Sequence, residues 1–160
     1  MGGVISLLLG SRLAVDGVFV MAVPYTLPVK HANIMRPLLP IISKFWRYYD
    51  RGSSDWTDGE AERTHSAYEK RPLQIYGELY DLLGVMRNEL HNLSAPLRLI
   101  YSQDDGSIPV SDAQEVLNSV ASSDKEVIVI DGSGHNIPRD AKRGEVFDQA
   151  NTFIQKVMTK

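Results

Sequence analysis

The sequence contains no cysteine, which excludes disulfide bonds and metal sites built from thiolates. It has no apolar run of the roughly 18 residues that a membrane-spanning helix requires, so we expect no stable membrane insertion. Nucleotide-binding glycine motifs are absent, and a formal net charge of −3 without a sustained basic segment excludes a nucleic-acid surface. No signal peptide is visible, which favours a cytoplasmic protein, although a segment missing from the N-terminus would have carried any such signal.

Three short apolar segments predict the fold class. The chain has 160 residues, 43% of them hydrophobic, which is the composition of a globular domain. Residues 18–23 are a continuous apolar run, typical of a strand that is covered on both faces, and residues 97–101 and 126–130, each with one charged residue, also predict strands. Helical periodicity follows each of the last two runs. This alternation of strand and helix predicts an α/β fold with parallel pairing.

Local signals predict how two of the core helices begin. Residues 2–13 are apolar on nearly every side, a pattern typical of a buried helix. Gly2 and Gly3 at its start suit a strand-to-helix turn, where two backbones approach closely. Further along, Ser111 and Gln114 match a capping box, in which the two residues satisfy each other's free backbone donors.

Residues 24–93 differ in character from the rest of the chain. Prolines interrupt the beginning of this region, and apolar and aromatic residues then recur at helical spacing from Pro40 to Tyr49. Residues 51–71 are polar and predict a loop, whereas residues 72–91 predict a second helix with one apolar stripe. The chain therefore divides into a first core segment, residues 1–23, an insertion, residues 24–93, and a second core segment, residues 94–160.

Acidic and basic side chains follow two neighbouring predicted strands. Residues 102–109 contain Asp104 and Asp105, and residues 131–136 contain His135. Ligands of open parallel sheets bind beyond the carboxyl ends of the strands, so an acid and a histidine would meet there if these strands pair. A histidine oriented by a carboxylate is the proton-transfer pair that a serine hydrolase needs.

Four segments resemble the α/β-hydrolase superfamily, and in particular its carboxylesterase, monoacylglycerol lipase and lysophospholipase branch. They are Met1-Gly2-Gly3, Ala95-Pro96-Leu97-Arg98-Leu99-Ile100, Asp105-Gly106-Ser107-Ile108-Pro109 and Ser133-Gly134-His135. The order of acid and then histidine is also that of the superfamily. The resemblance covers the whole chain, but only the C-terminal portion of such an enzyme. It implies a partial α/β-hydrolase fold in which residues 24–93 form a helical cap.

The resemblance also implies roles for individual residues. Members of this branch read G-x-S-M-G-G at the nucleophile elbow, so the serine would directly precede Met1, whose backbone N–H would belong to the oxyanion hole. The family pattern of an aspartate, two residues, a β-branched residue and proline favours Asp105 over Asp104 as the acid. His135 would be the base. The alternatives are that an aspartate forms only a turn, and that His135 only caps one near Asn136.

Two functional hypotheses follow. In the first, the chain is a fragment of a serine esterase that cleaves carboxylic esters through an acyl-enzyme, and it lacks the nucleophile, so that we expect it to be inactive alone. In the second, it is a non-catalytic module that binds a ligand or a partner. The substitute nucleophiles nearest to hand, none of them in an elbow, are Ser6, Ser11 and Ser107.

Further expectations concern ligands and partners. We expect no cofactor and no metal, because the remaining histidines lack ligand spacing: His31, His65 and His91. An apolar acyl group is the expected substrate feature, and the aromatic residues that either line its pocket or hold the cap together are Phe45, Trp46, Tyr49 and Tyr76. Without a neighbouring strand, the edge of residues 18–22 is expected to promote self-association.

Overall fold

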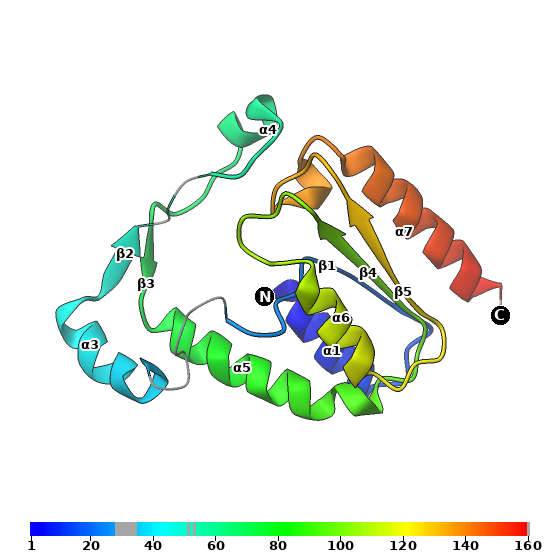
Figure 1. Cartoon of the computed structure of the whole chain (residues 1–160), viewed down its shortest axis with the longest axis horizontal. Helices are drawn as coiled ribbons and strands as arrows, with labels where there is room; N and C mark the ends of the chain where they lie inside the picture. The colour runs from blue at the N-terminus through cyan, green and yellow to red at the C-terminus, as the bar shows by residue number, and fades with distance from the viewer. Residues whose placement is uncertain (28–34, 51, 53, 160) are drawn as a thin grey trace.

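A computed structural model describes residues 1–27, 35–50, 52 and 54–159 (Figure 1). Its centre is a three-stranded parallel sheet with the strand order β1-β4-β5. The strands are β1 (Val18–Met21), β4 (Leu97–Ser102) and β5 (Lys125–Ile130). All three coincide with the predicted apolar runs, and their parallel pairing confirms the α/β prediction.

Helices cover both faces of this sheet (Figure 1). On one face lie α1 (Gly2–Arg12), α5 (Ile75–Glu89) and α6 (Ser111–Ser119), and on the other lies α7 (Arg143–Met158). Leu99 and Tyr101 of β4 belong to the first core, while Ile100 packs in the second with Val146 of α7. Successive residues of a strand point to opposite faces, which explains why β4 is buried along its whole length.

Close packing against the end of the sheet places the start of α1. A Cβ added to Gly10 would lie 2.5 Å from Cγ2 of Val18, and a Cβ added to Gly3 would lie 2.4 Å from Cγ2 of Val23. Val23 follows β1, so α1 begins beside the carboxyl end of that strand and runs back along it. The glycines permit this approach because they carry no side chain.

The other face of α1 is apolar but exposed. Residues at intervals of four lie on one side of a helix. Such a set, which we term the α1 stripe, keeps exposed fractions of 58, 44, 49 and 57% at Met1, Ile5, Leu9 and Leu13. Within the described residues, this helix therefore buries one apolar face and presents another to solvent.

The region between β1 and β4 contributes α5 to the core and carries several short elements besides. Its described elements before α5 are η1 (Arg36–Leu38), α3 (Leu39–Phe45), β2 (Tyr48–Asp50), α4 (Gly59–Arg63) and β3 (Lys70–Pro72), and η2 (Leu90–Asn92) follows α5. The predicted second helix is thus present, but the first prediction was wrong beyond Phe45. Tyr49 pairs with Arg71 in an antiparallel ribbon, and this long-range pairing overrides the local helical spacing.

Part of the segment that was predicted to be a loop is helical. This part is α4, which begins where the carboxylate of Asp58 accepts hydrogen bonds from the N–H groups of Glu60 and Ala61.

The predicted capping box is not formed. Ser111 already lies inside α6, because the N–H groups of Asp112 and Ala113 bond to the carbonyls of Pro109 and Val110. Gln114 instead donates to Oδ1 of Asn118 at 2.9 Å.

Candidate active site

The loops that follow β4 and β5 are joined at the carboxyl end of the sheet. The N–H of Gln103 donates to the carbonyl of Ile130 at 2.9 Å. The carboxylate of Asp104 accepts the N–H of Gly132 at 2.6 Å. Asp104 therefore ties the two loops together.

Asp105 and His135 meet between these loops. Oδ2 of Asp105 lies 2.9 Å from Nδ1 of His135, and Oδ1 accepts the N–H groups of Ser107 and Ile108 at 2.8 and 2.9 Å. The side chain of Asp105 is fully buried, whereas that of His135 is 39% exposed. Burial by itself raises the pKa of Asp105, but the hydrogen bonds from His135 and the two N–H groups outweigh it and hold this pKa below its usual value.

This environment determines which nitrogen of His135 carries the proton. An ionised carboxylate can only accept hydrogen bonds, so Nδ1 of His135 must be the donor to Asp105. Nε2 of the neutral ring is then left without a proton. Such a ring can take a proton from a hydroxyl, and the carboxylate stabilises the imidazolium that forms.

The structure brings the predicted oxyanion residue to the same edge. Met1 directly precedes α1, whose start packs against Val23 beyond β1. Because β1, β4 and β5 are parallel, Met1 lies at the edge that also carries the loops of Asp105 and His135.

The substitute serines serve local structure. Ser6 and Ser11 donate their hydroxyls to carbonyls of their own helix, those of Gly2 and Leu7, at 3.1 and 2.9 Å. Ser107 contributes its backbone N–H to Asp105.

The aromatic residues predicted for a pocket are dispersed. Phe45 and Trp46, at the end of α3, are 85 and 74% exposed. Tyr49 and Tyr76 contact each other with their ring centroids 5.0 Å apart, and burial together with Tyr49 raises the pKa of Tyr76 to about 12. A hollow of about 490 Å³ lies on the β2–β3 ribbon and includes Tyr68, but none of these four residues.

Two aspartates beside the predicted pair were missed in the sequence. The carboxylate of Asp55 accepts the N–H of His135 at 2.8 Å and that of Gly106 at 3.2 Å. Asp140 is fully buried and accepts the N–H of Gly134 at 2.6 Å. Asp55 lies in a segment that was predicted to be a loop, and Asp140 resembles an ordinary cap before α7. Neither position carries a sequence signal for a role at the site.

No group of three potential metal ligands occurs in the portion of the chain that the structure describes. His31 lies outside the described residues, while Nδ1 of His65 lies 3.0 Å from a guanidinium nitrogen of Arg139. None of the described helices combines the length and the apolarity that crossing a bilayer would require.

In this parallel sheet a loop with an aspartate and then a loop with a histidine follow successive strands, which is the chain order of the α/β-hydrolase fold. The family model described as "Serine aminopeptidase, S33" matches residues 1–142, and the chain belongs to this family.

Individual relatives are ester hydrolases. The chain is 25% identical over 157 residues to a carboxylesterase of Bacillus subtilis (strain 168), covering 98% of this chain but only 61% of that enzyme. It is 24% identical over 110 residues to a thermostable monoacylglycerol lipase of Bacillus sp. (strain H-257), covering 69% of this chain and 43% of the relative. These similarities confirm the predicted carboxylesterase and monoacylglycerol lipase branch.

Solved structures agree on the fold. A metagenome-derived lipolytic enzyme superposes with a TM-score of 0.83 at 18% identity, covering 98% of this chain and 62% of the other. The monoacylglycerol lipase of Paleococcus ferrophilus gives a TM-score of 0.74 at 15% identity, with 98 and 65% covered. The predicted α/β-hydrolase fold is therefore confirmed, and the chain spans 61% of the carboxylesterase that it matches.

Proposed function

We propose that Asp105 and His135 are the acid and base of a serine-hydrolase site that cleaves carboxylic esters. The observation that carries this proposal is the 2.9 Å contact between a buried Asp105 and Nδ1 of a partly exposed His135. Nε2 of His135 takes the proton of a serine hydroxyl as its oxygen attacks the ester carbonyl, and then returns it to the departing alcohol. Water releases the acid from the acyl-enzyme by the same route.

The nucleophile of this proposal is the serine of an elbow that ends with Met1-Gly2-Gly3, with the N–H of Met1 stabilising the oxyanion. The position of Met1 at the carboxyl edge of the sheet supports this role. The apolar α1 stripe further supports a protein in which additional residues cover α1. Residues 1–23 and 94–160 are then the core.

Residues 24–93 are proposed to form a cap over the site. The contacts of Asp55 with Gly106 and His135 support this assignment, because they place a segment of the region on both loops of the site. Exposed Phe45 and Trp46, with Tyr49 and Tyr76, are the candidate contacts for an apolar acyl group.

A first experiment measures p-nitrophenyl ester hydrolysis by the purified chain of 160 residues. Loss of the nucleophile of a catalytic triad lowers turnover on the order of 10⁶-fold, so we expect no significant activity. Fast turnover that disappears in His135→Ala would contradict this expectation.

A second experiment supplies the nucleophile. The N-terminal portion of the Bacillus subtilis carboxylesterase, up to its elbow serine, is joined to Met1, because this chain covers only 61% of that enzyme. We expect esterase activity that His135→Ala abolishes and that Asp105→Asn lowers about 10⁴-fold. The control is His91→Ala, at an exposed position of η2.

An active chimera that tolerates His135→Ala would overturn the proposal. A folded but inactive chimera would favour the second hypothesis, a module that binds a ligand or partner without catalysis.

A further inference from the structure

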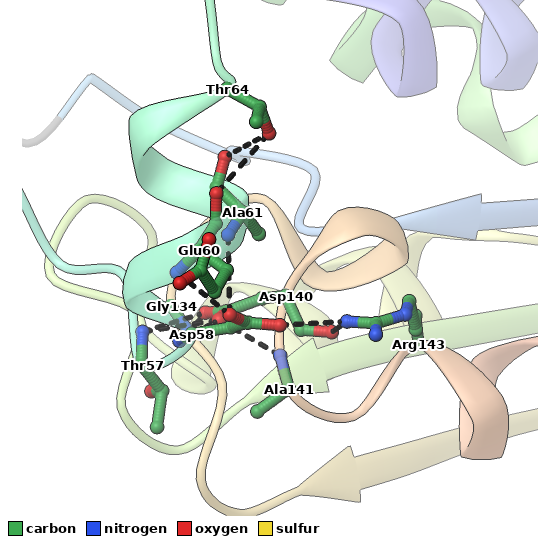
Figure 2. Close-up of polar contacts among 9 residues, drawn as sticks. All are labelled: Thr57, Asp58, Glu60, Ala61, Thr64, Gly134, Asp140, Ala141 and Arg143. Carbon is green, nitrogen blue, oxygen red and sulfur yellow. Dashed lines mark hydrogen bonds and ion pairs between the residues drawn. The ribbon is translucent and has the colours of Figure 1, made fainter.

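One segment of the proposed cap is fastened directly to the histidine loop (Figure 2). The link is the carboxylate of Asp140, which is fully buried and lies just beyond η3 (Ile137–Arg139). It accepts the backbone N–H groups of Thr57, Asp58, Gly134 and Ala141, at distances of 3.1, 2.7, 2.6 and 2.8 Å. One carboxylate thus holds two segments that are far apart in the sequence.

From the cap segment, the carboxylate of Asp55 in turn bonds to both loops of the site. Its Oδ2 accepts the N–H of His135 at 2.8 Å and the N–H of Gly106 at 3.2 Å. Asp55 therefore touches the base loop and the acid loop together. The backbones of Asp55 and Gly134 also approach closely, because a Cβ added to Gly134 would lie 2.1 Å from the carbonyl oxygen of Asp55.

Additional contacts extend this attachment. Arg143 of α7 donates to the carboxylate of Asp58 at 2.9 Å. Beside it, the guanidinium of Arg139 lies 6.0 Å from the centroid of the Trp56 ring, which itself packs against His65. Residues 55–65 and 134–143 consequently form one continuous contact, which we term the Asp55–Asp140 clamp.

The clamp bears on the orientation of His135. The ring is 39% exposed, so surrounding side chains restrain it only in part. Its backbone N–H and that of Gly134 are instead held by the two carboxylates of the clamp. A rotation of the peptide at either position would swing Nδ1 of His135 away from Asp105. Hydrogen bonds to charged groups resist such a rotation more strongly than neutral ones.

We propose that Asp55 and Asp140 are positioning residues that orient the His135 ring onto Asp105, so that docking of the cap segment sets the catalytic base. This inference rests on the proposed role of His135. Neither aspartate takes part in the chemistry itself. Both act through the backbone of the histidine loop.

The test reads the tautomer of His135 in long-range ¹H–¹⁵N spectra of the full chain, which require no enzymatic activity. They are recorded at alkaline pH, on the neutral ring. Asp105→Ala is the reference for a ring without its carboxylate. In the parent chain we expect the Nδ1–H form, because Asp105 can only accept.

Asp55→Ala and Gly134→Ala are expected to lower the ratio of the Nδ1–H to the Nε2–H form about tenfold or more, as Asp105→Ala does. Asp55→Asn keeps an acceptor oxygen and is therefore expected to keep the ratio of the two forms close to that of the parent. The matched control is Asp81→Ala on α5, which removes an exposed ion pair with Arg36, outside the clamp. Its ratio should equal that of the parent.

The outcomes separate this inference from the proposed function. If Asp105→Ala changes the tautomer but Asp55→Ala and Gly134→Ala do not, the clamp does not position His135, while the acid–base pair stands. A tautomer that is indifferent to Asp105→Ala overturns both proposals. Asp140→Asn is measured as well, and if it fails to fold, Asp55→Ala and Gly134→Ala decide the question.

Discussion

Asp112 and Asp140 are both buried aspartates, yet their surroundings act on them in opposite directions. Burial raises the pKa of Asp112, and its hydrogen bond from the N–H of Tyr25, at 2.8 Å, does not offset this. Burial also favours a higher pKa for Asp140, but the hydrogen bonds that its carboxylate accepts from Gly134 and three other backbone N–H groups outweigh burial and lower this pKa. The charge is thus favoured at Asp140 and disfavoured at Asp112.

Replacement by asparagine should therefore cost more stability at Asp140 than at Asp112. Asp140→Asn presents an NH₂ group to backbone donors, and we expect it to lower the free energy of unfolding by about 2–3 kcal/mol. Asp112→Asn removes a disfavoured charge and keeps one acceptor, so its loss should stay below about 1 kcal/mol. Urea unfolding at neutral pH measures both values. Equal losses would show that the hydrogen bonds of Asp140 do not stabilise its charge.

Acid should destabilise the folded chain by protonating the buried carboxylates of Asp105 and Asp140. A carboxylate whose pKa is lower in the folded chain stabilises that chain above its unfolded pKa, near 3.9, and this stabilisation is lost as the pH falls through the folded value. Asp105 and Asp140 both have lowered pKa values. We expect the melting temperature to drop below about pH 4, and to drop less steeply in Asp140→Asn, as followed by circular dichroism.

The contact between Asp105 and His135 could be predicted from a local signal, whereas their catalytic roles stay predictions. Asp105 and His135 follow adjacent strands, so their contact follows from the pairing of β4 and β5. Asp140 bonds to Thr57, 83 positions away, and to main-chain groups that are the same in every residue type. Nothing in the sequence pattern distinguishes such a partner, which is why the clamp was not predicted.

At the scale of elements, the contact between α1 and β1 depends on a missing side chain. A Cβ on Gly10 would lie 2.5 Å from Val18 and 3.3 Å from Leu93. We expect Gly10→Ala to lower the free energy of unfolding by about 1–3 kcal/mol, because the core must shift to admit the methyl group. The matched control is Gly144→Ala in α7, where a Cβ meets nothing within 4 Å. A neutral Gly10→Ala in denaturant titrations would contradict this packing.

Strands whose own composition is distinctive were predicted correctly, whereas a strand that depends on a distant partner was not. The strands β1, β4 and β5 are short segments rich in apolar residues, and their composition is sufficient to identify them. By contrast, β2 exists only because Tyr49 faces Arg71 across the ribbon, a pairing that its own spacing does not reveal.

At the scale of the whole molecule, the β1 edge of the sheet is open within the described residues. The N–H groups of Val18 and Ala22 donate to carbonyls of β4 and the residue before it. Because successive residues of a strand alternate in direction, the N–H groups of Phe19 and Met21 point away from β4. No described strand pairs there. An open edge beside the apolar α1 stripe favours self-association.

We expect the mass from light scattering to rise with the concentration of the 160-residue chain. Leu9→Lys, which places a charge on the α1 stripe, should reduce this association. Phe147→Lys is the matched control, because Phe147 is a similarly exposed residue of α7, at 57% against 49% for Leu9. A monodisperse monomer with a sharp melting transition would count against the prediction.

The α1 stripe is a surface on which a second polypeptide can dock, because a non-covalent interface does not require its two sides to belong to one chain. A separately expressed N-terminal half of a relative should therefore associate with this chain in trans. Ile5→Lys should raise the concentration of the added half that this association requires. Assembly from two parts would then be a property of the α1 surface alone.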